Sequence, residues 1–232
     1  DKFTASDCGV EFVSVRHEQV AATMADAYAR VSGKPGVTLT HVGPGAANQV
    51  IGVAAAYRDM SPVVAISGNE DRPRLGRDIW HEWDVGAIFD PITKWHAQIE
   101  RGEDASRLVR EALLTSVSGR PGPVHLDLPK DVSRAEAEYP ETDRRFYDHE
   151  DVRMPLDRPR PDPADVTRTV ELVEAAEKPV ILAGGGCVRS RVGDALRRVA
   201  ETARLPVVTS NSGRGVLSED HPLALGMIGV RG

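Results

Sequence analysis

The sequence predicts an α/β fold, in which a parallel-sheet domain with helices on both faces is followed by the first half of a second, Rossmann-like α/β domain. Short β-branched runs alternate with segments of helical periodicity, which is the pattern of βα units around a parallel sheet. The run at 62–68 is continuously apolar, as expected of a strand covered on both faces. Aromatic residues make up only 5% of the chain, so we expect an aliphatic core.

The first half of the chain is expected to supply four strands and three helices. Gly33 can end the first helix, which places Val20, Met24, Tyr28 and Val31 near one face. The expected strands lie at 11–15, 36–42, 62–68 and 123–129, and the expected helices lie at 17–32, 46–57 and 104–117.

The composition changes after residue 132. The stretch 133–163 is rich in Pro, Asp, Glu and Arg and has no sustained apolar period, so we expect a linker between a first domain at 1–132 and a second at 164–232. Roughly 70 residues are few for an independent α/β domain, so the second domain is expected to be partial. Its expected elements are helices at 165–176 and 191–204, strands at 179–183 and 206–209, and a plain turn at Gly184–Gly186.

Charge and composition exclude several classes of protein. With 29 basic and 35 acidic residues the formal net charge is −6, which gives no broad electrostatic footprint for nucleic acid or an anionic membrane. No run approaches the ~18 apolar residues of a membrane span, and no signal peptide is visible, so we expect a cytoplasmic protein. Cys8 and Cys187 lie far apart, which excludes a disulfide framework or a cysteine-based zinc site.

Glu18 is the sharpest candidate for chemistry. It lies where an expected strand meets an expected helix, and ligands of open α/β sheets bind at the carboxyl ends of strands. The dipole of a helix N-terminus also favours an ionised carboxylate. On the pattern alone, the favoured interpretation is a first-turn acid that only complements this dipole, because such acids are common in helices.

Two loops are further candidates. Gly43-Pro44-Gly45 follows a strand and opens a helix, which suits either a phosphate-cradling turn or a tight turn that lets backbones approach. Trp80-His81-Glu82 suits either a pocket wall or a loop anchored by its tryptophan. Three further histidines are expected in core or edge strand positions rather than as ligands: His41, His96 and His125.

Taken in series, the motifs closely resemble the pyrimidine-binding N-terminal domain, and then part of the central domain, of thiamine-diphosphate enzymes of the acetolactate synthase and 2-oxo-acid decarboxylase type. The segments that carry the resemblance are Arg16–Gln19, Met24–Arg30, Gly33–Val37, Gly43–Asn48, Ala56–Asp59, Pro62–Val64, Thr93–Trp95, Gly119–Val124, Asp127–Val132, Pro179–Gly186 and Glu219–Leu223.

The resemblance implies a role for each candidate. Glu18 would be catalytic, because the family's glutamate in this motif hydrogen-bonds N1′ of the cofactor pyrimidine and exchanges a proton there. Gly43, Pro44, Gly45 and Asn48 would line the cofactor cleft. On the substrate side lie His17 and the loop Trp80-His81-Glu82, where the family has Phe-Gln-Glu. Gly68-Asn69 likewise replaces the family's Gly-Gln. Because of these two departures, the resemblance indicates the cofactor class but not acetolactate synthase specificity.

The resemblance also implies partners. The substrate would be a 2-oxo acid, decarboxylated, carboligated or both, with thiamine diphosphate as cofactor and FAD left open. The family's Gly-Asp-Gly motif is not in this sequence, so the Mg²⁺ ligands are expected in a domain absent from this chain, and a first strand and helix are expected before residue 1. The partner would be a second copy in a homodimer or homotetramer, or a separate diphosphate-binding subunit.

Two alternatives stay open. One is a non-catalytic or split-subunit homologue that completes a site only with a separate diphosphate-binding chain. The other is a nicotinamide oxidoreductase that uses Gly184–Gly186, although the acidic residue expected about 20 residues later for a ribose contact does not end a strand here.

Overall fold

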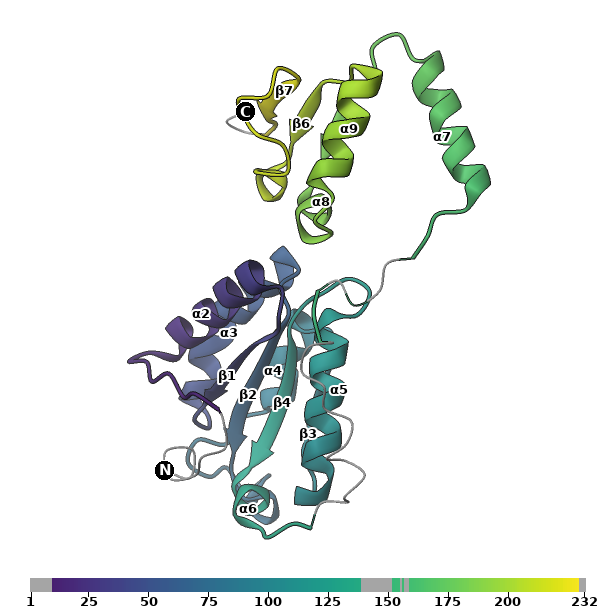
Figure 1. The fold of residues 1–232 in the computed structure, drawn as a ribbon. Coiled ribbons are helices and arrows are strands. Elements are labelled where there is room, and N and C mark those ends of the chain that lie inside the picture. The colour runs from purple at the N-terminus through teal and green to yellow at the C-terminus, as the bar shows by residue number, and fades with distance from the viewer. Residues whose placement is uncertain (1–9, 139–151, 155, 157–158, 230–232) are drawn as a thin grey trace. The chain divides into compact units, whose positions relative to one another are not determined.

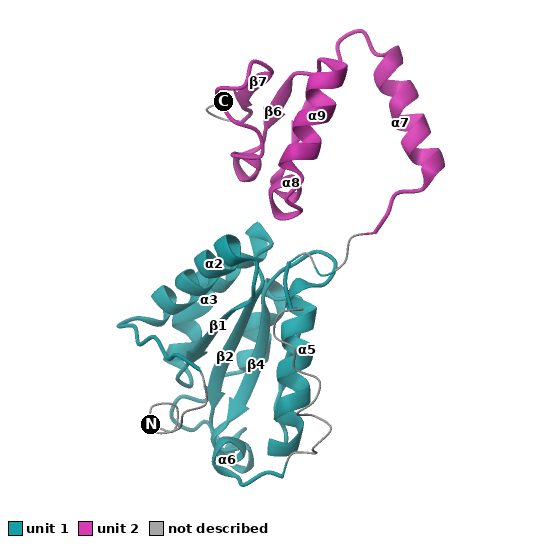
Figure 2. Cartoon of the chain, in the orientation of Figure 1, with its two compact units in different colours: residues 1–156 teal, residues 157–232 magenta. Residues whose placement is uncertain are grey.

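The computed structural model describes residues 10–138, 152–154, 156 and 159–229, so Cys8 and part of the expected linker lie outside the described residues. The chain divides into two compact units, residues 1–156 and 157–232 (Figure 2). Each unit is built on its own parallel sheet.

Unit 1 contains a four-stranded parallel sheet of order β1-β2-β4-β3 (Figure 1). In the register, Thr40 is opposite Ser67 and Gln98 is opposite Asp127. Because all four strands run in one direction, their carboxyl ends meet at one edge of the sheet. The strands are β1 (Gly36–Thr40), β2 (Val63–Asn69), β3 (His96–Gln98) and β4 (Val124–Pro129).

Helices cover both faces of this sheet, and successive side chains of β2 contact the helices on opposite faces. Val64 packs with Leu108 and Ala112 of α5 on one face, whereas Ala65 packs on the other face in a cluster with residues of α2, α3 and α4. The predicted α/β class with helices on both faces is therefore confirmed. The helices are α2 (Glu18–Ser32), α3 (Pro44–Asp59), α4 (Val85–Phe89), α5 (Ala105–Val117) and α6 (Lys130–Arg134), with 3₁₀ turns η1 (Arg72–Arg74), η2 (Asp90–Ile92) and η3 (Gly102–Asp104).

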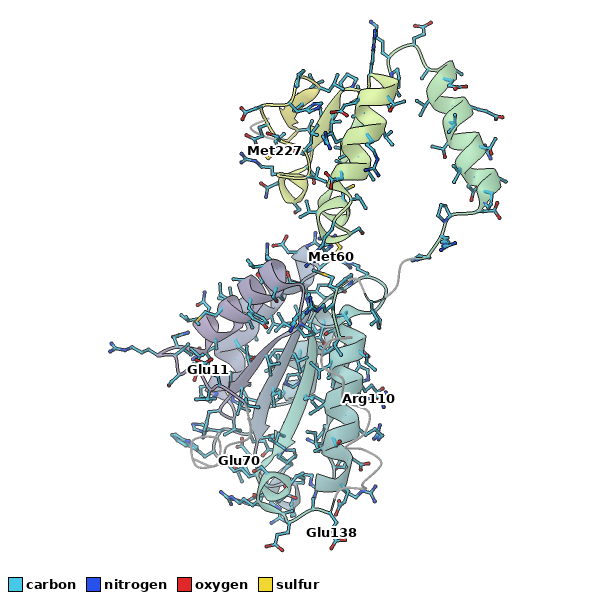
Figure 3. The ribbon with its side chains drawn as sticks, in the orientation of Figure 1. Glu11, Met60, Glu70, Arg110, Glu138 and Met227 are labelled. Atoms are coloured by element: carbon cyan, nitrogen blue, oxygen red, sulfur yellow. The ribbon has the colours of Figure 1, made fainter. Side chains whose placement is uncertain are left out.

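The segment 11–15 is not a strand, so this expectation is wrong. It is irregular, and its apolar side chains Phe12 and Val13 are exposed. Glu11 lies on this segment just before α2 (Figure 3). A strand needs a neighbour to accept its ladder hydrogen bonds, and among the described strands none pairs with these residues.

The first helix forms as predicted and ends at Gly33 with a left-handed φ of 73°. Its buried face, however, consists of small residues such as Ala22 and Ala29, while Val20, Met24, Tyr28 and Val31 are exposed. The small residues let α2 approach α3 closely, because a Cβ on Gly52 would lie 2.5 Å from the Cβ of Ala22.

Unit 2 contains a three-stranded parallel sheet of order β5-β6-β7. Its core gathers Ala183, Ala200, Val207, Val216 and Leu217. The elements are α7 (Pro163–Ala175), β5 (Ile181–Ala183), α8 (Gly185–Arg189), α9 (Gly193–Ala203), β6 (Val207–Thr209), η5 (Asn211–Gly213) and β7 (Ala224–Met227).

One local expectation in unit 2 is corrected. The glycines after β5 do not form a plain turn, because Gly184 caps the short helix α8. In α9 the buried residue is Ala200, whereas Val199 is exposed. Among the described helices of both units, none is long and apolar enough to cross a membrane.

Candidate active site

Glu18 is the first residue of α2, at the carboxyl edge of the unit 1 sheet. The preceding residue, His17, is extended and caps the helix, because its Nδ1 accepts a hydrogen bond from the backbone N–H of Gln19 at 3.2 Å. This cap starts the helix at Glu18 and leaves the carboxylate in its first turn.

Asn48 of α3 meets the carboxylate of Glu18. The Nδ2 of Asn48 donates a hydrogen bond to Oε2 of Glu18 at 3.0 Å. Gly45 lies between Glu18 and His41, since a Cβ at position 45 would stand 3.4 Å from Oε1 of Glu18 and 3.1 Å from Cβ of His41. The lack of a side chain at Gly45 therefore keeps the space beside the carboxylate open.

The surroundings of Glu18 favour its ionised form. The hydrogen bond from Asn48, followed by one from the backbone N–H of Glu18, holds the pKa of the carboxyl below its usual value. Partial burial opposes this shift, and attraction to His17 and His41 adds to it. Glu18 is thus a carboxylate at neutral pH, able to accept a proton or a hydrogen bond.

The loop that carries Trp80, His81 and Glu82 packs on the turn at Gly43. Gly43 has a φ of +61°, and a Cβ there would lie 2.9 Å from Cβ of His81, so this position requires glycine. The His81 ring meets the His41 ring edge-on at 6.0 Å between centroids. Trp80 lies beside His81 with its ring centroid 5.0 Å away and is 81% exposed.

Glu82 organises this loop. Its carboxylate accepts hydrogen bonds from the backbone N–H groups of Gly76 and, at 3.1 Å, Ile79. These two bonds lower the pKa of the Glu82 carboxyl. The Glu82 carboxylate therefore holds the backbone of the loop that carries Trp80 and His81.

The structure brings together most of the residues singled out from the sequence: Glu18, Gly45 and Asn48 form one cluster, and His81 packs beside it on Gly43. Sequence reasoning missed His41, which was expected in a strand but is exposed just beyond the end of β1. Its place two residues before the Gly-Pro-Gly turn was the signal that could have found it. His125, by contrast, is the core histidine that was expected, with 0% exposure.

Two family models match the chain. The N-terminal TPP binding domain of thiamine pyrophosphate enzymes matches residues 1–88, which include the Glu18 cluster and the loop at 80–82. The central domain of the same enzymes matches residues 166–232. The chain belongs to the thiamine pyrophosphate enzymes.

Curated relatives match this chain along nearly its whole length. A probable acetolactate synthase large subunit from Methanocaldococcus jannaschii is 41% identical over 97% of this chain and 38% of its own length. The acetolactate synthase large subunit of Parasynechococcus marenigrum is 38% identical over 98% of this chain and 36% of its own. The acetolactate synthase isozyme 3 large subunit of Escherichia coli is 37% identical over 97% of this chain and 38% of its own length. The chain therefore spans less than two fifths of the length of these relatives.

Proposed function

We propose that this chain supplies the pyrimidine-binding side of an acetolactate synthase-like active site, which uses thiamine diphosphate to decarboxylate a 2-oxo acid, to carboligate it, or both. The observation that carries the proposal is the pair of Glu18 and Asn48, joined at 3.0 Å beside Gly45. The pair lies within the residues matched by the N-terminal TPP binding domain.

The residues present fit the cofactor's pyrimidine ring. A flat heteroaromatic ring needs a hydrogen-bonding group at its edge and backbone close to its face. Glu18 offers an ionised carboxylate held by Asn48, and Gly45 provides the close approach that a Cβ would close off. Gly43 and Pro44 continue this side-chain-poor turn into α3.

Thiamine diphosphate supplies a nucleophilic carbon that adds to a carbonyl and stores the electrons released on decarboxylation. The part of Glu18 is to hold a proton at N1′ of the pyrimidine and to exchange it during the reaction. The lowered pKa keeps the Glu18 carboxylate ionised, so it is free to accept a hydrogen bond or a proton from the ring. Asn48 orients the carboxylate, and the helix N-terminus favours its negative charge.

The second side of the proposed site is the loop over Gly43. His81 packs on that glycine, and Trp80 presents a largely exposed ring next to it. We assign these two residues and His17 to the substrate side, where a 2-oxo acid would approach. Glu82 supports them by fixing the loop through Gly76 and Ile79.

The rest of the site would come from a diphosphate-binding domain, in a homodimer, a homotetramer or a separate subunit. Among the described residues, no group of three or more His, Cys, Asp or Glu side chains could hold a metal ion. We propose that oxygen ligands of that domain would hold Mg²⁺.

The proposal is tested with the complete enzyme, meaning this sequence together with its diphosphate-binding domain or subunit. The assay follows CO₂ release and product formation from a panel of 2-oxo acids, with and without thiamine diphosphate and Mg²⁺. We expect cofactor-dependent consumption of at least one 2-oxo acid. Cofactor-independent turnover, or binding of thiamine diphosphate without any turnover of the panel, would contradict the proposal and favour a non-catalytic homologue.

A further inference from the structure

A second polar cluster lies deeper at the carboxyl edge of the sheet, on the face covered by α4. Asp127 of β4 accepts hydrogen bonds on one oxygen, Oδ2, from Nδ2 of Asn69 at 2.7 Å and from Nε2 of Gln98 at 2.7 Å. Asn69 ends β2 and Gln98 ends β3, so the last polar side chains of three parallel strands lie in contact. The function proposed above uses none of these residues.

A cavity of about 360 Å³ opens beside this cluster. Asn69, Gln98 and Asp127 line it, together with Glu82, Trp83 and Asp84 of the loop before α4. Asp127 is only 6% exposed, and its second oxygen, Oδ1, has no hydrogen-bond partner. An unpaired buried carboxylate oxygen is costly, so its persistence at a cavity wall points to an occupant that pairs with it.

The charges of the wall indicate the sign of that occupant. The residues that line the cavity include three carboxylates and one imidazole, that of His96, whereas Lys and Arg are not among the described residues that line it. Backbone N–H groups hold two of these carboxylates in place: Glu82 accepts from Ile79, and Asp84 accepts from Ala87 at 2.9 Å. An anion such as a 2-oxo acid would be repelled here, which separates this cavity from the Glu18 site.

The wall also contains an aromatic ring. Trp83 lines the cavity and is 45% exposed, so its indole face is accessible to a ligand. Tryptophan is the best aromatic partner for organic cations. A metal ion fits less well, because no described group of three or more His, Cys, Asp or Glu side chains could hold one.

We propose that this cavity binds an organic cation, an alkylammonium or guanidinium group, whose N–H donates to Oδ1 of Asp127 while its charge lies against Trp83. Such a group would satisfy the unpaired oxygen and offset the buried negative charge. Burial raises the pKa of the Asp127 carboxyl, and a neighbouring cation would lower it again. The cation can come from a free small molecule or from a Lys or Arg side chain of a polypeptide.

The test is a titration of the full chain followed by amide NMR. The probes are n-butylammonium and methylguanidinium, and the matched neutral probes are 1-butanol and urea. We expect saturable shifts around Asn69, Gln98 and Asp127 with the cations and none with the neutral probes. Equal shifts with the neutral probes, or no saturable shift with either cation, would overturn the proposal.

Variants test the assigned oxygen. Asp127→Asn keeps an acceptor for Asn69 and Gln98 but removes the charge, so it should weaken cation binding about tenfold or more, the loss expected for a hydrogen bond to a charged group. Glu111→Gln removes a charge from the exposed side of α5 and should leave the affinity within about twofold. Equal affinity in Asp127→Asn and Glu111→Gln overturns the proposal.

Two further measurements complete the test. If Asp127→Asn does not fold, Asp84→Asn keeps the cap on α4 and removes one wall charge, and an unchanged affinity in that variant overturns the proposal. A lysine tripeptide is then compared with its norleucine counterpart. Tighter binding of the lysine peptide than of n-butylammonium assigns the cation to a polypeptide, and the reverse order assigns it to a free small molecule.

Discussion

Two carboxyl groups at the same edge of one sheet behave in opposite ways. Glu18 accepts hydrogen bonds from Asn48 and from its own backbone N–H, and its pKa is lowered. Asp127 accepts two, from Asn69 and Gln98, yet its pKa is raised. The number of hydrogen bonds therefore does not decide the direction of the pKa shift, because at Asp127 the loss of hydration outweighs both amides.

The comparison separates two kinds of polar site in this protein. The Glu18 cluster is open and holds an ionised carboxylate, which suits proton exchange with a ligand. The Asp127 cluster is buried and holds a carboxylate that is short of a partner. The loop at 76–84 links them, since His81 packs on Gly43 of the first site while Trp83 lines the cavity of the second.

The largest expected effect is on turnover. In the complete enzyme, Glu18→Gln retains a hydrogen-bonding group but cannot transfer the proton, so the rate should fall about 10²–10⁴-fold, the usual range for loss of a general acid or base. The measurement is kcat for whichever 2-oxo acid is consumed, with Glu111→Gln as the matched control. A rate for Glu18→Gln within a few-fold of the wild type would show that turnover does not need proton transfer by Glu18.

The next effect is on stability, and it should be largest at the buried site. Asp127→Ala leaves the amides of Asn69 and Gln98 without their acceptor, and we expect a loss of about 3 kcal/mol in the free energy of unfolding. Asp127→Asn restores an acceptor oxygen and should cost less than about 1 kcal/mol. Urea unfolding of the two variants checks this order, and equal losses would show that the hydrogen bonds are not the cause.

The two carboxyls should also give opposite pH dependences. The raised pKa of Asp127 means that its contribution to stability is lost as pH rises through its folded pKa and is fully present below the ordinary aspartate value of 3.8. The lowered pKa of Glu18 means that its contribution is present above the ordinary value of 4.5 and is lost as pH falls through its folded pKa.

This contrast is measured by urea unfolding of the wild type, Asp127→Asn and Glu18→Gln between neutral and acidic pH. Towards acidic pH, the wild type should gain stability relative to Asp127→Asn and lose it relative to Glu18→Gln. Differences of the same sign for both variants would contradict the assigned environments.

The smallest effect concerns the shared loop. Glu82→Gln weakens the acceptor for the N–H groups of Gly76 and Ile79, so these two amides should exchange with solvent faster. The amides of β2 and β4 should keep their protection. Hydrogen exchange followed by NMR checks this, and unchanged protection at Gly76 and Ile79 would show that Glu82 does not hold the loop.

Much of the fold and of the open site is predictable from the sequence because the signals are local. The α2 helix, its Gly33 end and the strand–turn–helix around Gly43–Gly45 depend on neighbours along the chain. The strand expected at 11–15 fails because pairing is not a local property. His96 was expected in a strand position, but the range of β3 was not predicted, since His96–Gln98 is only three residues long and carries two polar side chains.

The buried cluster could not be predicted for the same reason. Asp127 lies 58 residues from Asn69 and 29 from Gln98, and only the strand order brings them together. The chain offers a polar residue near the end of each strand, but their convergence depends on β4 lying between β2 and β3. His41 is an intermediate case, because its position before the turn was visible and its exposure was not.

The central claim is that Glu18 exchanges a proton with the cofactor, and hydrogen–deuterium exchange at thiazolium C2 of thiamine diphosphate tests it most directly. In the complete enzyme we expect Glu18→Gln to bind the cofactor and to exchange this proton at least about 10²-fold more slowly than the wild type, with Glu111→Gln unchanged. Exchange at the wild-type rate in cofactor-loaded Glu18→Gln would contradict the account.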